Sequence, residues 1–122
     1  MSAKNVLILD DEKEIAELIK EFIEILNHKV VTFSDPFEAL QHIKDSITVG
    51  ERFDLVFTDF FMPKMEGDKF SEEVFKIDSN IDIYLLSGRH SDELKQFQKN
   101  SIKGFINKPF RIEDFERILG DE

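Results

Sequence analysis

Short runs of apolar residues alternate along this chain with longer stretches whose apolar residues recur at helical spacing. Five such runs each predict a buried strand: Val6 to Leu9, Lys29 to Phe33, Phe53 to Thr58, Ile81 to Leu86 and Gly104 to Asn107. Because the runs are continuously apolar, we expect a parallel sheet covered by helices on both faces. Right-handed crossovers then predict a doubly wound α/β sandwich.

The amphipathic stretches that follow the runs predict five helices, each with one apolar face. The apolar positions of these faces are Ile15, Leu18, Ile19, Phe22, Ile23 and Leu26; Phe37, Leu40 and Ile43; Phe70, Val74 and Phe75; Leu94 and Phe97; and Ile112, Phe115, Ile118 and Leu119. The second helix has the clearest start, with Asp35 as N-cap, Pro36 at the first helical position and Glu38 at the third. A polar loop is expected from Ser46 to Arg52. The fourth helix, which Ser91 would cap, has the thinnest apolar face.

Composition narrows the classes of function. Residues 1–122 are expected to form one domain. The formal net charge of -10 argues against nucleic acid and anionic membranes as direct partners, because phosphates are bound by basic surfaces. The chain has no cysteine, which excludes disulfides and thiolate ligands and agrees with a cytoplasmic location. No apolar run is long enough to span a bilayer, and the first residues do not resemble a signal peptide.

Polar side chains capable of chemistry follow four of the predicted strands. They are Asp10 and Asp11 after the first strand, Asp59 after the third, Ser87 after the fourth and Lys108 after the fifth. In a doubly wound sheet, ligands bind beyond the carboxyl ends of the strands, where the strand order reverses. If the first and third strands are neighbours, their carboxylates converge at that edge.

Converging carboxylates carry an electrostatic cost that a cation can remove. Two carboxylates about 5 Å apart repel by roughly 3 kcal/mol at an effective dielectric constant near 20. Mg²⁺ suits a site of one or two carboxylates with waters and phosphate oxygens. Lys108 adds a positive charge and Ser87 a hydroxyl, and both groups can hold phosphoryl oxygens. The set favours phosphoryl transfer, with an aspartate nucleophile that would form an acyl phosphate.

Taken singly, each of these features has an ordinary structural explanation. An acidic pair after a strand commonly begins a helix, a Ser-Gly pair is a turn signal, and a lone lysine is usually a surface residue. Their occurrence at the ends of four different predicted elements favours a functional site. The histidines His28, His42 and His90 show no such pattern, and we interpret all three as surface residues.

Four segments resemble the motifs of response regulator receiver domains. The segment from Asp59 to Gly67, DFFMPKMEG, resembles the family signature D-x-x-M-P-x-M-x-G, which begins at the phosphoacceptor. The segment from Leu7 to Glu12 resembles the acidic pair of the family, Leu85 to Gly88 its hydroxyl segment, and Lys108 to Phe110 its lysine motif. The motifs occur in the family's order, and the resemblance covers the whole chain.

The resemblance implies a flavodoxin-like (βα)₅ fold with strand order 2-1-3-4-5. It also implies a two-component phosphorelay, in which a histidine kinase or histidine phosphotransfer protein phosphorylates Asp59. The chain would be an autocatalytic phosphoryl acceptor with weak self-dephosphorylation rather than an enzyme. It would signal to an output protein or domain through the face made by the fourth helix, the fifth strand and the fifth helix.

The family's site residues map onto this sequence where the motifs match. Mg²⁺ would be bound by Asp11 directly, by Asp10 through water, by Asp59 and by the backbone carbonyl of Phe61. Two further residues, Ser87 and Lys108, would hold the phosphoryl oxygens. The resemblance also implies a cis peptide bond between Lys108 and Pro109.

Some positions depart from the family's usual pattern. The aromatic switch position holds Phe105, which has no hydroxyl to anchor it. Phe61 lies two residues after Asp59, and Arg89 lies two residues after Ser87. A bulky apolar side chain and a cation at these places are expected to slow hydrolysis of the phosphorylated state, by excluding water and by pairing with a phosphoryl oxygen.

Two alternative functions remain to be compared with this one. An Mg²⁺-dependent aspartyl-phosphate hydrolase typically carries a second Asp two residues after its nucleophile, where this chain has Phe61. A pseudo-receiver that acts only as a binding surface has no need of the intact set of Asp10, Asp11, Asp59, Ser87 and Lys108. Both a stand-alone relay and a part of a longer protein are compatible with the sequence.

Overall fold

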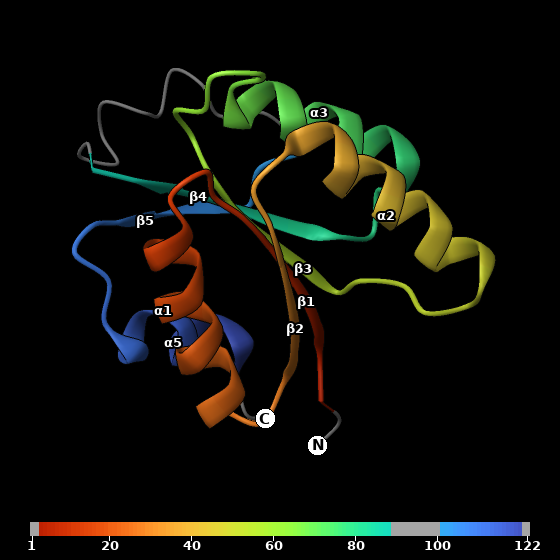
Figure 1. Cartoon of the computed structure of the whole chain (residues 1–122). Coiled ribbons are helices and arrows are strands. Elements are labelled where there is room, and N and C mark those ends of the chain that lie inside the picture. The colour runs from red at the N-terminus through yellow and green to blue at the C-terminus, as the bar shows by residue number, and fades with distance from the viewer. Residues whose placement is uncertain (1–2, 89–100, 121–122) are drawn as a thin grey trace.

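The computed structural model describes residues 3–88 and 101–120 and has a five-stranded parallel sheet at its centre (Figure 1). The strands are β1 (Asn5–Leu9), β2 (Lys29–Phe33), β3 (Leu55–Asp59), β4 (Asp82–Ser87) and β5 (Gly104–Asn107). Their order is β2-β1-β3-β4-β5, and every neighbouring pair is parallel. The predicted doubly wound fold and its strand order are therefore confirmed.

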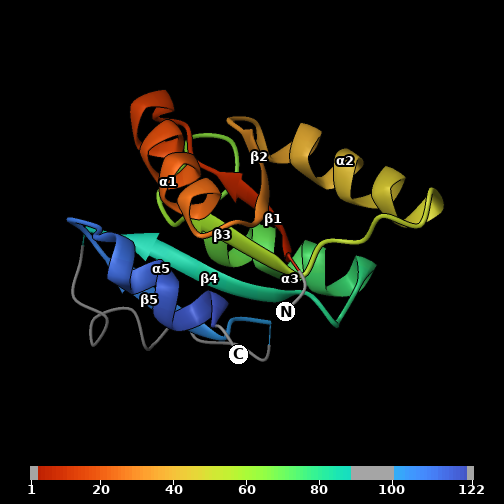
Figure 2. The ribbon, with the colours of Figure 1, turned by 90° about the horizontal axis from the view of Figure 1, so that it is seen from below.

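Helices cover both faces of the sheet, as the apolar runs predicted. Helices α1 (Lys13–Ile25) and α5 (Ile112–Leu119) lie on one face, and α2 (Pro36–Thr48) and α3 (Gly67–Ile77) lie on the other (Figures 1 and 2). The expected fourth helix, with Ser91, Leu94 and Phe97, lies outside the described residues. Within the described ranges, no helix has the length and apolar character needed to cross a membrane.

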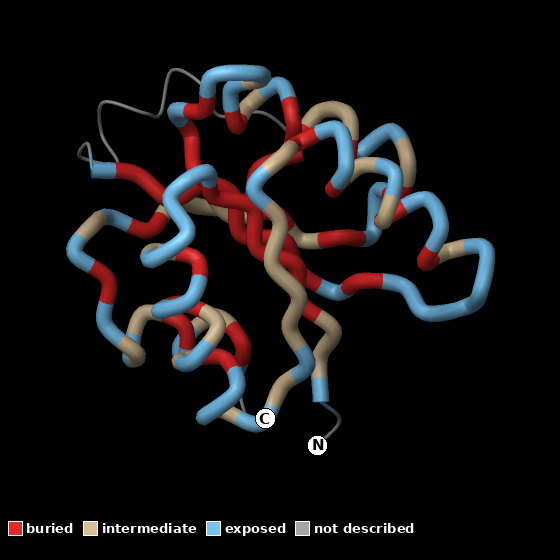
Figure 3. Tube along the Cα trace, viewed as in Figure 1, coloured by how far each residue is buried: buried red, intermediate tan, exposed pale blue. Residues whose placement is uncertain are grey.

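The core consists of two main clusters, one on each face of the sheet. Phe57 of β3 packs edge-on against Phe115 of α5, with ring centroids 5.1 Å apart, in the cluster under α1 and α5. Phe70 and Val74 of α3 join β1 and β3 in the cluster under α2 and α3. Every residue of the central strand β3 is buried, whereas the edge strand β2 is only half-buried (Figure 3). The site at the end of β3 therefore stands on a fully buried strand.

Two expectations for α2 are wrong. The helix continues to Thr48, because Ser46 is buried within it and its hydroxyl donates to the Ile43 carbonyl at 2.7 Å, so no loop begins there. Phe37 is 57% exposed and does not belong to the apolar face, which consists of the predicted Leu40 and Ile43 together with Ala39. The predicted N-cap is confirmed, since the Asp35 side chain accepts N–H groups of the first turn.

The interpretation of the histidines as surface residues is also wrong for His42. Its ring is half-buried between the rings of Phe33 and Phe53, with centroids 5.0 and 5.6 Å away. His28 is half-buried too, and its Nδ1 accepts a backbone N–H. Both histidine side chains therefore contact neighbouring residues of the fold. The third histidine, His90, lies outside the described residues.

Candidate metal centre

The pairing of β1 with β3 brings the acidic residues together at the carboxyl edge of the sheet. Leu9 is the register partner of Thr58, so Asp10 and Asp59 follow at the same level on adjacent strands. The nearest carboxylate oxygens of Asp10, Asp11 and Asp59 all lie within 4.8 Å of one another. This group of three carboxylates could hold a metal ion, as the sequence predicted from the strand ends.

Asp10 is the most deeply buried member of the group. Its Oδ1 accepts the backbone N–H of Glu12 at 2.9 Å. Its buried Oδ2 finds no hydrogen-bond partner among the residues that the structure describes. Burial is the main cause that raises the pKa of Asp10 above its ordinary value. A buried carboxylate oxygen without a donor is costly in an apo fold, and a cation would compensate it.

Asp59 is only 6% exposed, and its pKa is raised to about 6. Burial is the largest cause and the charge of Asp10 the second, while Lys108 acts in the opposite direction. The Nζ of Lys108 lies 3.8 Å from Oδ1 of Asp59. One ammonium therefore does not offset the burial and mutual repulsion of two neighbouring carboxylates.

Ser87 and Lys108 lie at the same edge on the neighbouring strands. Leu86 is the register partner of Asp59, so Ser87 lies one position beyond it on β4, and it is buried. The backbone N–H of Lys108 donates to the Ser87 carbonyl at 2.7 Å, which ties the end of β5 to the end of β4. The Lys108–Pro109 peptide bond is cis, as the resemblance implied. The structure thus assembles all five polar residues that the strand ends singled out.

The loop from Phe60 to Glu66 follows the phosphoacceptor candidate directly. Phe60 is buried, and its backbone N–H donates to the Leu86 carbonyl at 3.1 Å. Phe61 is 44% exposed, and its ring lies edge-on to the ring of Phe60 with centroids 4.6 Å apart. The Phe61 side chain is therefore partly exposed and rests on the ring of Phe60. Arg89, the other residue expected to tune the rate, lies outside the described residues.

Gly67 allows α3 to begin close to the backbone of Asp59. A Cβ at this position would lie 2.5 Å from the Asp59 carbonyl oxygen and 2.9 Å from the Cα of Phe60. The backbone N–H of Gly67 donates to the Phe60 carbonyl at 2.8 Å and closes the loop. The sequence motif contains this glycine, but the contact that explains it is visible only in the structure.

Phe105 of β5 is half-buried and packs against a small cluster beside the site. The cluster consists of Phe60, Leu85 and Ile102. Because Phe60 directly follows Asp59 in the chain, this cluster lies between the candidate phosphoacceptor and the expected switch position. The role of Phe105 as a switch stays a prediction.

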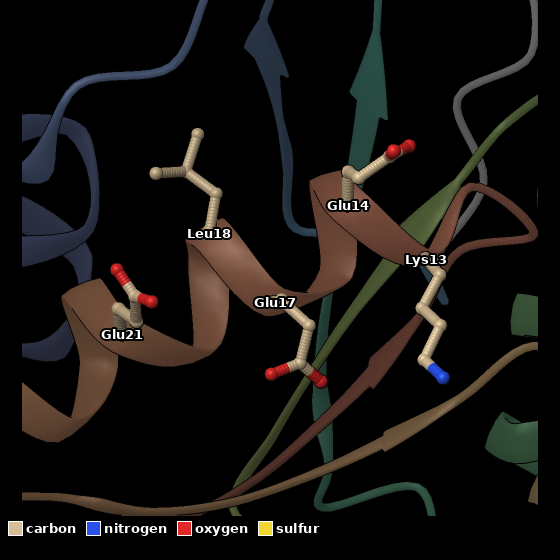
Figure 4. Close-up of a pocket in the computed structure, with 5 residues that line it drawn as sticks. All are labelled: Lys13, Glu14, Glu17, Leu18 and Glu21. Carbon is tan, nitrogen blue, oxygen red and sulfur yellow. The ribbon is translucent and has the colours of Figure 1, made fainter.

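Two surface hollows lie along α1. One, of about 530 Å³, runs along the exposed face of the helix and is lined by Lys13, Glu14, Glu17, Leu18 and Glu21. Figure 4 shows Glu14 and Leu18 pointing to one side of the helix and Lys13 and Glu17 to the other, so no group of them converges. A smaller hollow of about 290 Å³ includes Asp10 and Asp11 and extends the acidic edge toward β2.

Known proteins resemble the chain over nearly its whole length. Residues 6–119 match the response regulator receiver domain family. The chemotaxis protein CheY4 of Vibrio cholerae superposes with a TM-score of 0.85 at 28% identity, and the match covers 97% of each chain. A receiver domain protein of Clostridium thermocellum gives a TM-score of 0.84 at 26% identity, with 95% of this chain and 90% of that one covered.

Matches of similar extent occur among curated sequences. The transcriptional regulatory protein MalR of Bacillus subtilis is 27% identical over 120 residues, which cover 96% of this chain and 49% of MalR. This chain spans half or less of the length of the curated relatives it matches. The strand order, the acidic edge and the family match over residues 6–119 together show that the chain belongs to the response regulator receiver domains, the signalling modules of two-component systems.

Proposed function

We propose that the chain is a phosphorylation-switched receiver that accepts a phosphoryl group onto Asp59 from a histidine kinase or a histidine phosphotransfer protein. The observation that carries this proposal is the convergence of Asp10, Asp11 and Asp59, with Lys108 Nζ 3.8 Å from Asp59. The pKa values of Asp10 and Asp59 are raised even though the charge of Lys108 lowers both, so this edge carries negative charge that Lys108 does not offset. Such an edge is suited to a divalent cation and a phosphoryl group together.

The residues present fit Mg²⁺. The donors are hard oxygens, and Oδ2 of Asp10 is buried without a donor among the described residues. Asp11, Asp59 and the backbone carbonyl of Phe61 would bind the ion directly, and Asp10 would act through water. When bound, Mg²⁺ would neutralise negative charge on the carboxylates and on the incoming phosphoryl oxygens.

The transfer step uses the Asp59 carboxylate as the nucleophile. One carboxylate oxygen forms a bond to phosphorus while the bond from phosphorus to the donor's imidazole nitrogen breaks. The electron pair of that bond stays on the imidazole nitrogen. Lys108 and Ser87 hold the phosphoryl oxygens in this step. Asp59 must be ionised to react, so a pKa near 6 in the metal-free protein favours reaction above that pH.

The proposed output surface is formed by β5, α5 and the helix expected within residues 89–100. Lys108 directly follows β5 and would move toward the phosphoryl group. Phe105 packs against the cluster that contains Phe60, the residue after Asp59, so rearrangement of the loop would reach the switch position through this cluster. The phosphorylated state would then present a changed face to the output protein or domain.

Phosphorylation by a small donor tests the assignment. Acetyl phosphate with Mg²⁺ should add one phosphoryl group to the wild type, seen by mass spectrometry of the intact protein, and none to Asp59→Asn. Asp54→Asn is a matched control, because Asp54 is an exposed carboxylate at the other end of β3. It should label like the wild type. Equal labelling of Asp59→Asn and the wild type would show that Asp59 is not the acceptor.

A further inference from the structure

Asp35 makes contacts in two directions. Its Oδ1 accepts the backbone N–H groups of Phe37 at 2.8 Å and Glu38 at 3.3 Å, which caps the first turn of α2. Its Oδ2 forms an ion pair with Nζ of Lys64, a residue of the loop between β3 and α3. One carboxylate therefore joins the start of α2 to the loop that follows Asp59.

The end of β2, from which the β2–α2 loop starts, is also joined to the acidic pair. The backbone N–H of Asp10 donates to the carbonyl of Phe33, the last residue of β2, at 3.1 Å. The segment from Phe33 to Asp35 thus contacts the β1–α1 loop at one end and the β3–α3 loop at the other. The two loops that carry the proposed metal ligands are bridged by a segment that carries none.

The β3–α3 loop has apolar and backbone anchors as well. Met62 is buried in the cluster under α2 and α3, and Gly67 donates its N–H to the Phe60 carbonyl. Phe61, Pro63 and Lys64 are exposed, so the ammonium of Lys64 ties the outward-facing part of the loop. The proposed ligand carbonyl of Phe61 belongs to this part.

We propose that the Asp35–Lys64 ion pair positions the β3–α3 loop for the cation, so that Lys64 and Asp35 are positioning residues of the metal centre. The proposal rests on the proposed function for the identity of the site. Lys64 is 60% exposed, so the pair adds little to global stability. Its effect is local, because a loop held in the bound conformation loses less conformational entropy when the ion binds.

The charges of both partners are secure near neutral pH. The hydrogen bond from Lys64 holds the pKa of Asp35 below its usual value, and the same contact raises the pKa of Lys64. The negative charge of Glu38 nearby also favours the ammonium form of Lys64. The pair therefore persists over the pH range in which Asp59 is ionised.

Variants can separate positioning from helix capping. Lys64→Gln removes the ammonium and leaves the cap, while Asp35→Ser keeps a capping oxygen and removes the charge. Each should raise the Kd of Mg²⁺, measured by isothermal titration calorimetry, by about two- to fivefold, the range that an exposed ion pair can supply. The double variant should be no weaker than either single variant, and Lys64→Arg should retain most of the affinity. Lys69→Gln removes a similarly exposed lysine that pairs within α3, and it should leave the Kd unchanged.

Amide hydrogen exchange in the metal-free protein gives an independent measure. The backbone amides of the loop from Phe60 to Gly67 should exchange faster in Lys64→Gln than in the wild type or Lys69→Gln. Wild-type Kd values in both single variants, or additive effects in the double variant, would overturn the proposal. If the wild type bound no Mg²⁺, the proposed function would fail, and unchanged exchange in Lys64→Gln would separately show that the pair does not hold the loop.

Discussion

Carboxylates lie at both edges of the sheet, but their interactions with neighbouring groups differ between the two edges. At the amino edge, Asp54 accepts the backbone N–H of Asn5 at 2.8 Å. Asp78, which is buried there, accepts the N–H of Asn80 at 3.0 Å and lies 3.8 Å from Arg52. These carboxylates stabilise the loops that precede β3 and β4, and each accepts a hydrogen bond from a backbone N–H group.

At the carboxyl edge the charges are concentrated rather than compensated. Asp10 and Asp59 are both buried, and the pKa of each is raised although the charge of Lys108 acts in the opposite direction on both. The amino edge uses carboxylates to hold the fold, whereas the carboxyl edge keeps charges that are unfavourable in the apo fold. Perturbed groups of this kind cluster at functional sites, where stability is lower than the fold could reach.

The comparison predicts opposite effects of the same substitution at the two edges. Asp59→Asn should raise the free energy of unfolding of the metal-free protein at pH 7.5, on the order of 2 kcal/mol, because it removes a buried charge. Asp78→Asn should lower it by about 1 kcal/mol, because it weakens the contacts with Asn80 and Arg52. Urea denaturation with a chelator present measures both values. Changes of the same sign in the two variants would contradict the distinction between the edges.

The pH dependence of stability should reveal the same distinction. The pKa of Asp59 is about 6 in the folded state and near 3.8 in the unfolded chain, so between these values the folded state holds more protons. Stability should therefore fall as the pH rises from about 4 to about 6, by no more than the gain expected for Asp59→Asn. Asp10, whose pKa is also raised, acts in the same direction. Carboxyl groups with a lowered pKa, such as Asp35, act in the opposite direction, so the difference in stability between wild type and Asp59→Asn isolates the contribution of Asp59. This difference should shift against the wild type as the pH rises through this window, and the same pH dependence in both proteins would refute the assignment.

Mg²⁺ should offset the electrostatic cost of the neighbouring carboxylates at the carboxyl edge. At about twenty times its Kd, the ion should stabilise the wild type by about 1.8 kcal/mol, because it binds the folded state alone. Thermal denaturation with and without Mg²⁺ measures the effect as a shift in Tm. The shift should nearly vanish in Asp11→Ala, while Asp54→Asn should keep it. An undiminished shift in Asp11→Ala would exclude Asp11 as a ligand.

The sequence predicted the strands and the edge well because both depend on local signals. Continuous apolar runs fixed the buried strands, and the polar residues after Leu9 and Thr58 could only lie at the carboxyl ends of those strands. The order of the strands in the sheet has no such local signal. Apolar runs do not say which strand lies beside which, so convergence of Asp10 with Asp59 depended on the resemblance to the family.

The remaining features are tertiary and had no local signal. Helical periodicity places Phe37 on the apolar face of α2, but the helix docks through the small residue Ala39 and leaves Phe37 exposed. Asp35 was predicted as an N-cap, and nothing in its surroundings indicated that its second oxygen pairs with Lys64, which is 29 residues away. Contacts between loops depend on how the helices pack, which no single segment encodes.

The smallest predicted effect concerns an apolar side chain at the carboxyl edge. Phe53 before β3 is 5% exposed, whereas Phe61 after β3 is 44% exposed and rests on the ring of Phe60. Phe61 follows Asp59 by two residues, and its ring is accessible to solvent. We expect the ring to hinder the water that would hydrolyse phosphorylated Asp59, since it offers that water no hydrogen bond.

Phe61→Asn should therefore speed dephosphorylation by at least about tenfold, which corresponds to a barrier lower by about 1.4 kcal/mol. The decay of the phosphorylated species, followed by mass spectrometry after removal of the donor, measures the rate. Phe61→Leu is a suitable control, because it keeps an apolar side chain and should retain most of the slow decay. Phe37→Asn tests whether any exposed phenylalanine matters, and it should decay like the wild type because Phe37 lies in the first turn of α2 and does not follow Asp59. If Phe61→Asn decays at the wild-type rate, the ring does not control access of water, and the difference between the two edges is then electrostatic alone.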